Sequence, residues 1–195
     1  MVTEPSGKSI VVEYLEGQLR IFDNSLGVIT NAPGYDWHMI NLRNYLNLSA
    51  VALPAVSIES MDFSPLGAGS GMIGLPGDHT PPSRFVRAVA WSQTARPLKD
   101  SNEAIYELLR ILDNFNLPLG AAEGSDSQDE DVEGMRSSTI WTTASDLDER
   151  TLYFHTQHNR RLRKVDLRRI DFSGNEIRHL TLDETKEQDV KDLTP

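Results

Sequence analysis

The stretch GQLRIFDNSLGVITNAPGYDWHMINLRNYLNLS, residues 17–49, decides the fold class because strand-like and helix-like patterns follow one another in it. Residues 19–22 alternate in polarity and predict a strand that reaches Asp23, and residues 27–30 predict a second strand. The pair Pro33 and Gly34 then predicts a turn before a helical pattern begins. Asn31 is therefore expected at the exit of a strand, where packing alone gives no reason for an amide.

Patterns on either side of residues 27–31 extend this reading. Residues 9–14 alternate in polarity and predict the hairpin partner of residues 19–22, with the turn at residues 15–18. From Asp36, an expected N-cap, apolar residues recur at helical spacing and predict a helix that ends near Leu48.

The middle of the chain is rich in glycine and proline. Residues 50–82 contain few continuous periodic segments and predict a long loop, whose apolar residues favour a substrate-facing or interface role over disorder. Residues 84–91 return to a strand-like composition. Residues 100–116 carry one apolar stripe and predict a helix lying against a sheet, with Asp100 and Glu103 as a capping box.

The last third predicts a hairpin and a charged end. Residues 138–144 and 150–156 predict two strands around a turn at 145–148, and residues 161–167 predict a third. The run of carboxylates at residues 123–134 predicts a solvated acidic loop. It does not predict a calcium loop, because the carboxylates lack the required spacing. Strands, a helix and more strands predict an α+β fold.

Composition excludes several kinds of partner. The 195 residues have a formal net charge of −10 and a sequence pI of about 4.9. Nucleic acids and anionic membrane surfaces would repel such a chain. There is no apolar run of about 18 residues, so no transmembrane helix is predicted. The polar start predicts no signal peptide, and the expected soluble protein is cytoplasmic or periplasmic.

Three blocks of sequence resemble the choloylglycine hydrolases, a family that includes bile salt hydrolases and penicillin V acylases. The first contains GVITNAP at 27–33, DWH at 36–38 and NLRNY at 41–45. The second contains GSGM at 69–72, LPGD at 75–78 and PSRFVR at 82–87. The third, STIWTTASD at 138–146 followed by RRLR at 160–163, is similar to the penicillin acylase-like branch.

The resemblance implies a partial fold. Family members form a four-layer αββα sandwich of two antiparallel sheets, and their nucleophile is an amino-terminal cysteine, as in other Ntn hydrolases. This sequence contains no cysteine. We therefore expect residues 1–184 to be the carboxy-terminal part of such a domain, followed by a charged tail at 185–195. Thr3 or Ser6 is disfavoured as a substitute nucleophile, because the segment after them already forms the predicted hairpin.

Two residues match the active site of the family. Asn31 matches its oxyanion-hole asparagine, and a fixed carboxamide N–H is suited to stabilise a tetrahedral oxyanion. Arg84 matches its active-site arginine, whose charge would favour a thiolate. The structural alternatives are an asparagine that caps a turn and an arginine in a surface ion pair. Arg87, three residues after Arg84, is distinguished from it by the motif alone.

Other polar residues are assigned structural roles. Asp23 and Asn24 are expected to end a strand, and His38 is expected to hold local packing. His155 and His158 lie on or just after an expected strand and would face opposite ways, so the sequence predicts no metal site. The family resemblance implies no cofactor.

The long loop supplies the candidates for substrate contact. Apolar residues there would form an acyl-binding surface, whereas the three tryptophans are expected in the core. The candidates are Met61, Phe63, Leu66, Met72 and Ile73.

Two functions follow. The leading one is a carboxy-terminal part of a linear-amide hydrolase, inactive alone, whose substrate is a bile salt, penicillin V or an acyl homoserine lactone. Its partners would be that small molecule and a missing amino-terminal half, and the family suggests a homo-oligomer. The alternative is a non-catalytic binding or scaffold protein derived from the family.

Overall fold

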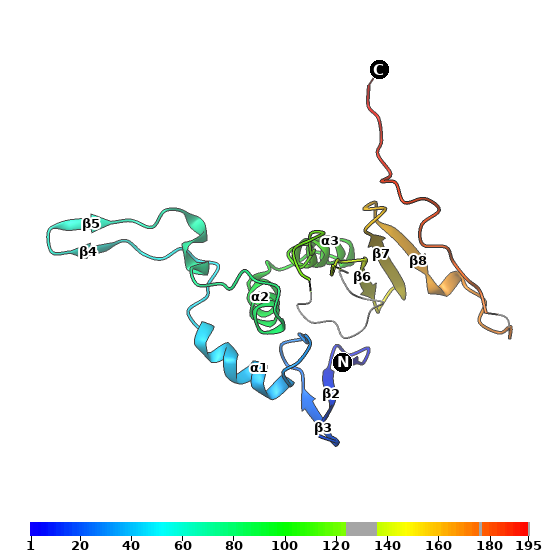
Figure 1. The fold of residues 1–195 in the computed structure, drawn as a ribbon, viewed down its shortest axis with the longest axis horizontal. Coiled ribbons are helices and arrows are strands. Elements are labelled where there is room, and N and C mark those ends of the chain that lie inside the picture. Colours follow the sequence, from blue (N-terminus) through cyan, green and yellow to red (C-terminus); the bar gives the residue numbers. More distant parts are fainter. Residues whose placement is uncertain (124–135, 176, 195) are drawn as a thin grey trace. The chain divides into compact units, whose positions relative to one another are not determined.

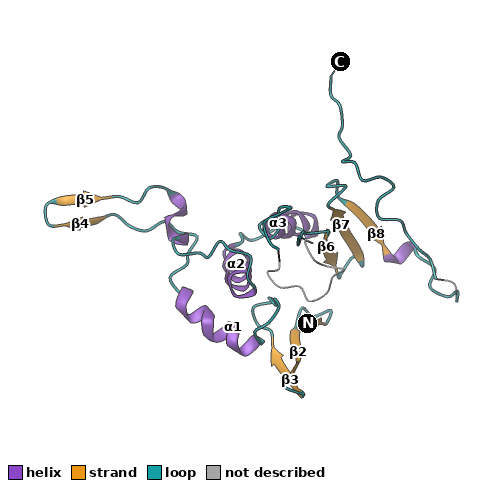
Figure 2. Ribbon diagram, viewed as in Figure 1, coloured by secondary structure: helices purple, strands orange, loops and turns teal. Residues whose placement is uncertain are grey.

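The computed structural model describes residues 1–123, 136–175 and 177–194. The chain divides into two compact units, Met1–Arg96 (unit 1) and Pro97–Pro195 (unit 2). Each unit combines helices with antiparallel strands, which agrees with the expected α+β class (Figure 1, Figure 2). The expected acidic loop lies, apart from Glu123, outside the described residues.

Unit 1 begins with a three-stranded antiparallel sheet. Its order is β1-β2-β3, with β1 at Val2–Thr3, β2 at Ser9–Leu15 and β3 at Gln18–Asp23. The turn between β2 and β3 has two residues, Glu16 and Gly17, with φ of 52° and 76°. Positive φ at both positions is typical of the type I′ turn that matches strand twist. The predicted hairpin is confirmed.

The strand predicted at residues 27–30 is wrong. These residues have no regular secondary structure, and their first backbone donors are satisfied locally. The N–H of Gly27 donates to the carbonyl of Asn24 at 3.1 Å, and the N–H of Val28 donates to Asn24 Oδ1 at 3.2 Å. Asn24 is 4% exposed, which supports its expected structural role.

The helix expected from Asp36 to Leu48 starts one residue earlier and ends sooner. Helix α1 spans Tyr35–Leu42, and a 3₁₀ turn, η1, continues it over Arg43–Tyr45. Gly34 is its N-cap, so the assignment of that role to Asp36 is wrong. The backbone N–H of Tyr35 donates instead to the Glu13 carboxylate of β2 at 3.0 Å, which places an anion at the positive end of the helix.

The long loop contains short elements, and the segment after it is helical. A hairpin of β4 at Val56–Ile58 and β5 at Met61–Phe63 precedes η2 at Ala68–Met72. Helix α2 then spans Pro81–Thr94, so the strand-like reading of residues 84–91 is wrong. Two prolines open the helix, where proline is favoured, and its buried apolar residues recur at helical rather than alternating spacing.

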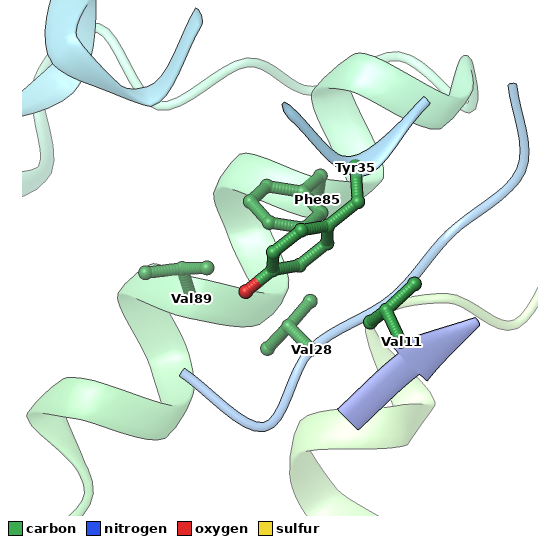
Figure 3. Close-up of a cluster of buried hydrophobic side chains, with 5 residues drawn as sticks. All are labelled: Val11, Val28, Tyr35, Phe85 and Val89. Atoms are coloured by element: carbon green, nitrogen blue, oxygen red, sulfur yellow. The ribbon is translucent and has the colours of Figure 1, made fainter. Parts of the chain in front are cut away.

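The core of unit 1 joins its sheet to α1 and α2. Tyr35 lies edge-on to Phe85, with ring centroids 6.1 Å apart (Figure 3). Burial raises the pKa of Tyr35, whose hydroxyl donates to Asn24 Oδ1 at 3.2 Å. The cluster consists of Val11, Val28, Tyr35, Phe85 and Val89.

Unit 2 packs one helix on a second antiparallel sheet. Helix α3 spans Ser101–Asp113, and Asp100 is its N-cap as predicted, accepting from the N–H of Glu103 at 2.9 Å. Ile105 and Leu109 of α3 are buried with Ala144 of the sheet, so the predicted contact between helix and sheet is confirmed. The sheet has the order β6-β7-β8, with strands at Trp141–Asp146, Thr151–Thr156 and Arg163–Asp166; a 3₁₀ turn, η4, follows at Leu167–Arg169.

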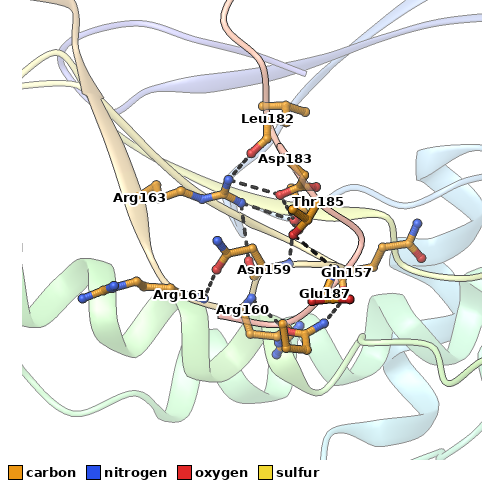
Figure 4. A network of polar contacts seen from close by, with 11 residues as sticks. Gln157, Asn159, Arg160, Arg161, Arg163, Leu182, Asp183, Thr185 and Glu187 are labelled. Carbon is orange, nitrogen blue, oxygen red and sulfur yellow. Dashed lines mark hydrogen bonds and ion pairs between the residues drawn. The ribbon is translucent and has the colours of Figure 1, made fainter. Parts of the chain in front are cut away.

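A polar network ties a later segment of unit 2 to this sheet (Figure 4). Arg163 forms an ion pair with Asp183 at 3.2 Å and also donates to the carbonyl of Leu182. The hydroxyl of Thr156 donates to the same carboxylate at 2.8 Å. Beyond residue 184, the described tail forms no helix, and Asp189 pairs with Arg161 at 2.9 Å.

Candidate active-site wall

Asn31 and Arg84 lie in direct contact although 53 positions separate them. Asn31 follows the irregular segment 27–30, and Arg84 lies in the first turn of α2. The Arg84 Nη2 donates to Asn31 Oδ1 at 2.6 Å, and its Nε donates to the carbonyl of His79 at 3.0 Å. The guanidinium is therefore held at two points, one of which is the candidate carboxamide.

This contact orients the Asn31 amide. A guanidinium only donates, so the atom that it contacts must be the carboxamide oxygen. The NH₂ group of Asn31 has no hydrogen-bond partner among the described residues, and the residue is exposed. The Nδ2 hydrogens are thus available as uncharged donors to a ligand oxygen, next to a permanent positive charge.

The structure gives the two arginines, which only the motif distinguished in the sequence, different surroundings. Arg87 is 6% exposed and donates from Nη1 to the carbonyls of Pro76 and Asp78, at 2.9 and 2.5 Å. Burial lowers its pKa, while the Asp78 charge acts in the opposite direction. Arg87 therefore fastens the preceding loop to α2, and Arg84 faces Asn31.

Asp78, which sequence reasoning missed, organises the start of α2. Its Oδ1 accepts from the Thr80 N–H at 2.9 Å and the Thr80 hydroxyl at 2.5 Å, and its Oδ2 accepts from the Ser83 hydroxyl at 2.6 Å. The hydrogen bond from Ser83, followed by those from Thr80, holds the pKa of Asp78 well below its usual range. The signal was present in the sequence, since Asp and Thr just before two prolines are typical of a helix start.

The five apolar candidates all lie between β4 and the loop before α2. Met61 and Phe63 belong to β5, in a hairpin that projects from the rest of unit 1 (Figure 1). No hydrogen bond among the described residues joins this hairpin to Asn31 or Arg84. Four of the five side chains are at least half exposed, and Met72 ends the partly buried η2. Their role in binding stays a prediction.

Metal and membrane features can be stated for the described residues. They contain no group of three or more His, Asp or Glu side chains arranged to hold a metal ion. Burial, followed by the charge of Arg160, lowers the pKa of His155, which is 6% exposed. Within the same ranges, none of the helices is long and apolar enough to cross a membrane.

Comparison with known proteins identifies the class. The model of the linear amide C–N hydrolases of the choloylglycine hydrolase family matches residues 1–182. The chain belongs to this family.

Individual relatives sharpen the placement. A bile salt hydrolase/transferase of Clostridium perfringens is 35% identical over 179 residues, which are 91% of this chain and 52% of the relative. A conjugated bile acid hydrolase of Lactobacillus acidophilus is 28% identical over 85% of this chain and 51% of its own length. The chain thus spans about half the length of the curated relatives that it matches.

The fold is also similar to solved structures of such hydrolases. A crystal structure of a mutant conjugated bile acid hydrolase from Clostridium perfringens has a TM-score of 0.81 at 30% identity, covering 97% of this chain and 55% of the other. Penicillin V acylase from Agrobacterium tumefaciens has a TM-score of 0.60 at 23% identity, covering 85% and 44%. The second likeness concerns the fold alone.

Proposed function

We propose that this chain forms the carboxy-terminal part of a linear-amide hydrolase, in which Asn31 and Arg84 line the site of bond cleavage. The observation that carries the proposal is the 2.6 Å hydrogen bond from Arg84 to Asn31. It leaves the Asn31 NH₂ group without a hydrogen-bond partner among the described residues and keeps a fixed positive charge beside it, which suits binding of a developing oxyanion. In the fold of the family, residues 1–184 would complete part of an αββα sandwich.

The nucleophile would come from outside this sequence, which contains no cysteine. In the mechanism that the family implies, a cysteine sulfur attacks the amide carbonyl and the Asn31 N–H stabilises the oxyanion. The amine then leaves with a proton, and water hydrolyses the thioester. Arg84 would favour the attacking thiolate, since a nearby cation lowers the pKa of a thiol. Loss of one oxyanion donor typically slows such reactions about 100- to 1,000-fold.

Conjugated bile salts are the proposed substrates. The relatives with 35% and 28% identity are named for bile salt and conjugated bile acid hydrolysis. The steroid part of such a substrate is large and apolar, and Met61, Phe63, Leu66, Met72 and Ile73 would supply contacts of that character. Penicillin V and acyl homoserine lactones stand second, because the acylase likeness supports only the fold.

Reconstitution tests this function. The full chain would be assayed alone and coexpressed with the amino-terminal half of the Clostridium perfringens relative, by following release of taurine from a taurine-conjugated bile salt. We expect turnover only in the combination. Asn31→Ala should lower kcat about 100- to 1,000-fold, whereas Asn44→Ala, an exposed asparagine in η1, should not. Turnover by the isolated chain, or an unimpaired Asn31→Ala variant, contradicts the proposal.

A non-catalytic binding protein is the second candidate. The observation in its favour is that each unit has its own buried apolar cluster while the sequence lacks a cysteine. It predicts a monodisperse chain that unfolds cooperatively by itself. A catalytic part that needs a complement should instead expose sheet edges and self-associate, which size-exclusion chromatography of the isolated chain detects.

A further inference from the structure

We propose that His38 is a positioning residue for Asn31, whose backbone it fixes so that the carboxamide stays aimed at the reacting oxygen. The inference rests on the proposed function only in assigning Asn31 as the oxyanion donor. The contacts themselves belong to the folded chain. They join Asn31, α1 and α2 through one buried imidazole.

The hydrogen bond of His38 defines its tautomer. His38 Nε2 lies 2.9 Å from the backbone carbonyl oxygen of Asn31. A carbonyl only accepts, so Nε2 must carry the hydrogen. The Thr30 hydroxyl is 3.3 Å from the same nitrogen, and it donates to the carbonyl of Pro81, at the start of α2, at 3.1 Å. His38 Nδ1 is buried and has no hydrogen-bond partner among the described residues. Within these residues, the imidazole therefore forms hydrogen bonds through Nε2.

Stacking prevents the imidazole from turning. His38 is 2% exposed and lies parallel to the Phe85 ring, with centroids 4.8 Å apart and an interplanar angle of 9°. Phe85 is itself fully buried and directly follows Arg84 in α2. Trp37 also meets the imidazole edge-on, with ring centroids 5.6 Å apart. The donor on α1 is thus stacked against α2, the helix that carries Arg84.

Asn31 is consequently held at both ends. Its backbone oxygen accepts from His38 and its side-chain oxygen accepts from Arg84. The segment before it lacks a strand ladder that could hold it, and Asn31 is exposed. Without the imidazole donor, the Asn31 peptide can rotate even if the core remains packed. A misplacement of about 1 Å in a catalytic group can cost roughly 100-fold in rate.

Substitutions at His38 can separate the contribution of its ring volume from that of its hydrogen-bond donor. Phenylalanine at position 38 keeps a flat ring against Phe85 but removes the donor, and glutamine restores a donor at a similar reach. The matched control is His155→Phe, which replaces the other strongly buried histidine, in unit 2. The readout is the NMR signal of the Asn31 side-chain amide in the ¹⁵N-labelled full chain, with the methyl signals of Val28 and Val89 reporting the core.

We expect His38→Phe to shift the Asn31 amide signal and the Arg84 Nε–H signal while the core methyls stay in place. His38→Gln should return both signals toward their original positions, and His155→Phe should leave them unchanged. In the reconstituted enzyme, His38→Phe should lower kcat roughly 10- to 100-fold with little change in KM. His38→Gln should recover part of that loss.

Two results would overturn the inference. One is an Asn31 signal that does not move in His38→Phe. The other is an equal shift of the core methyl signals in His38→Phe and His38→Gln, which would show that His38 contributes only packing. If the NMR shifts appear but the combined halves never hydrolyse the bile salt, the proposed function fails and the positioning role of His38 stands.

Discussion

Unit 1 and unit 2 use similar elements for different ends. Each has a three-stranded antiparallel sheet and an apolar helix packed in its core. In unit 1, two polar side chains, the buried His38 and the partly buried Arg84, hold one exposed amide, that of Asn31. In unit 2, they bind a later segment to the sheet, with Asp183 accepting from Arg163 and Thr156 (Figure 4). The comparison teaches that buried and partly buried polar side chains orient a surface group in unit 1 and attach a later segment to the sheet in unit 2.

Removing the aromatic centre of unit 1 should have the largest effect. Phe85→Ala opens a cavity beside Tyr35 and His38, and should lower the free energy of unfolding by about 3–5 kcal/mol. Hydrogen exchange followed by mass spectrometry should show lost protection in unit 1. The matched change in unit 2, Ile105→Ala, should cost about 2–5 kcal/mol and reduce protection there. If both variants lost the same protection from hydrogen exchange in both units, the distinction between the two cores would be contradicted.

The next largest effect on stability is expected at the ion pair between Arg163 and Asp183 in unit 2. Asp183→Asn weakens the hydrogen bonds of a mostly shielded ion pair, whose side chains are 25% and 17% exposed. We expect a loss of about 1.5–3 kcal/mol in urea unfolding. Asp189→Asn, at a pair with side chains 71% and 40% exposed, should change stability by no more than about 0.5 kcal/mol. Equal losses would show that burial does not distinguish these pairs.

Protonation of His155 in unit 2 should have a smaller effect on stability. Burial, then Arg160, lowers the pKa of His155 in the folded chain, although Asp113 opposes this. As pH falls below about 6.5, the unfolded chain takes up the proton first, so stability present above that pH is lost below it. Thermal unfolding across this range should show the loss. His155→Phe should flatten the response, and His158→Phe should preserve it.

The smallest effect is expected at the start of α2. Hydrogen bonds from Ser83 and Thr80 lower the pKa of Asp78, so its contribution is present above the unfolded-state pKa of about 3.9 and is lost as pH falls further. Asp78 is exposed, which limits the size of this contribution. The stability difference between the original chain and Asp78→Asn should shrink in acid titrations. Asp23→Asn serves as the control, and a difference that persists in acid would contradict this role.

Sequence patterns predict structure correctly where the residues that form a turn or a helix start are neighbours in the chain. The β2–β3 hairpin follows from a two-residue turn with Gly17, and the start of α3 follows from Asp100 and Glu103. Motif resemblance also selected Asn31 and Arg84, which lie in contact. Errors fell on residues 27–30 and 84–91. There, β-branched and aromatic residues resemble a strand, but the hydrogen bond that the Val28 N–H donates to Asn24 Oδ1 and the helical packing of Phe85 prevail.

By itself, the sequence determined the family, the β2–β3 and β6–β7 hairpins and the main helix of unit 2, and it predicted the two candidate site residues. Those features depend on local backbone preferences and on motifs that can be read in one dimension. Only the tertiary structure decided that Arg84 rather than Arg87 meets Asn31, and that His38 donates to the Asn31 backbone. The reason is physical. A hydrogen bond across 53 residues depends on how α2 packs, and no spacing along the chain records it.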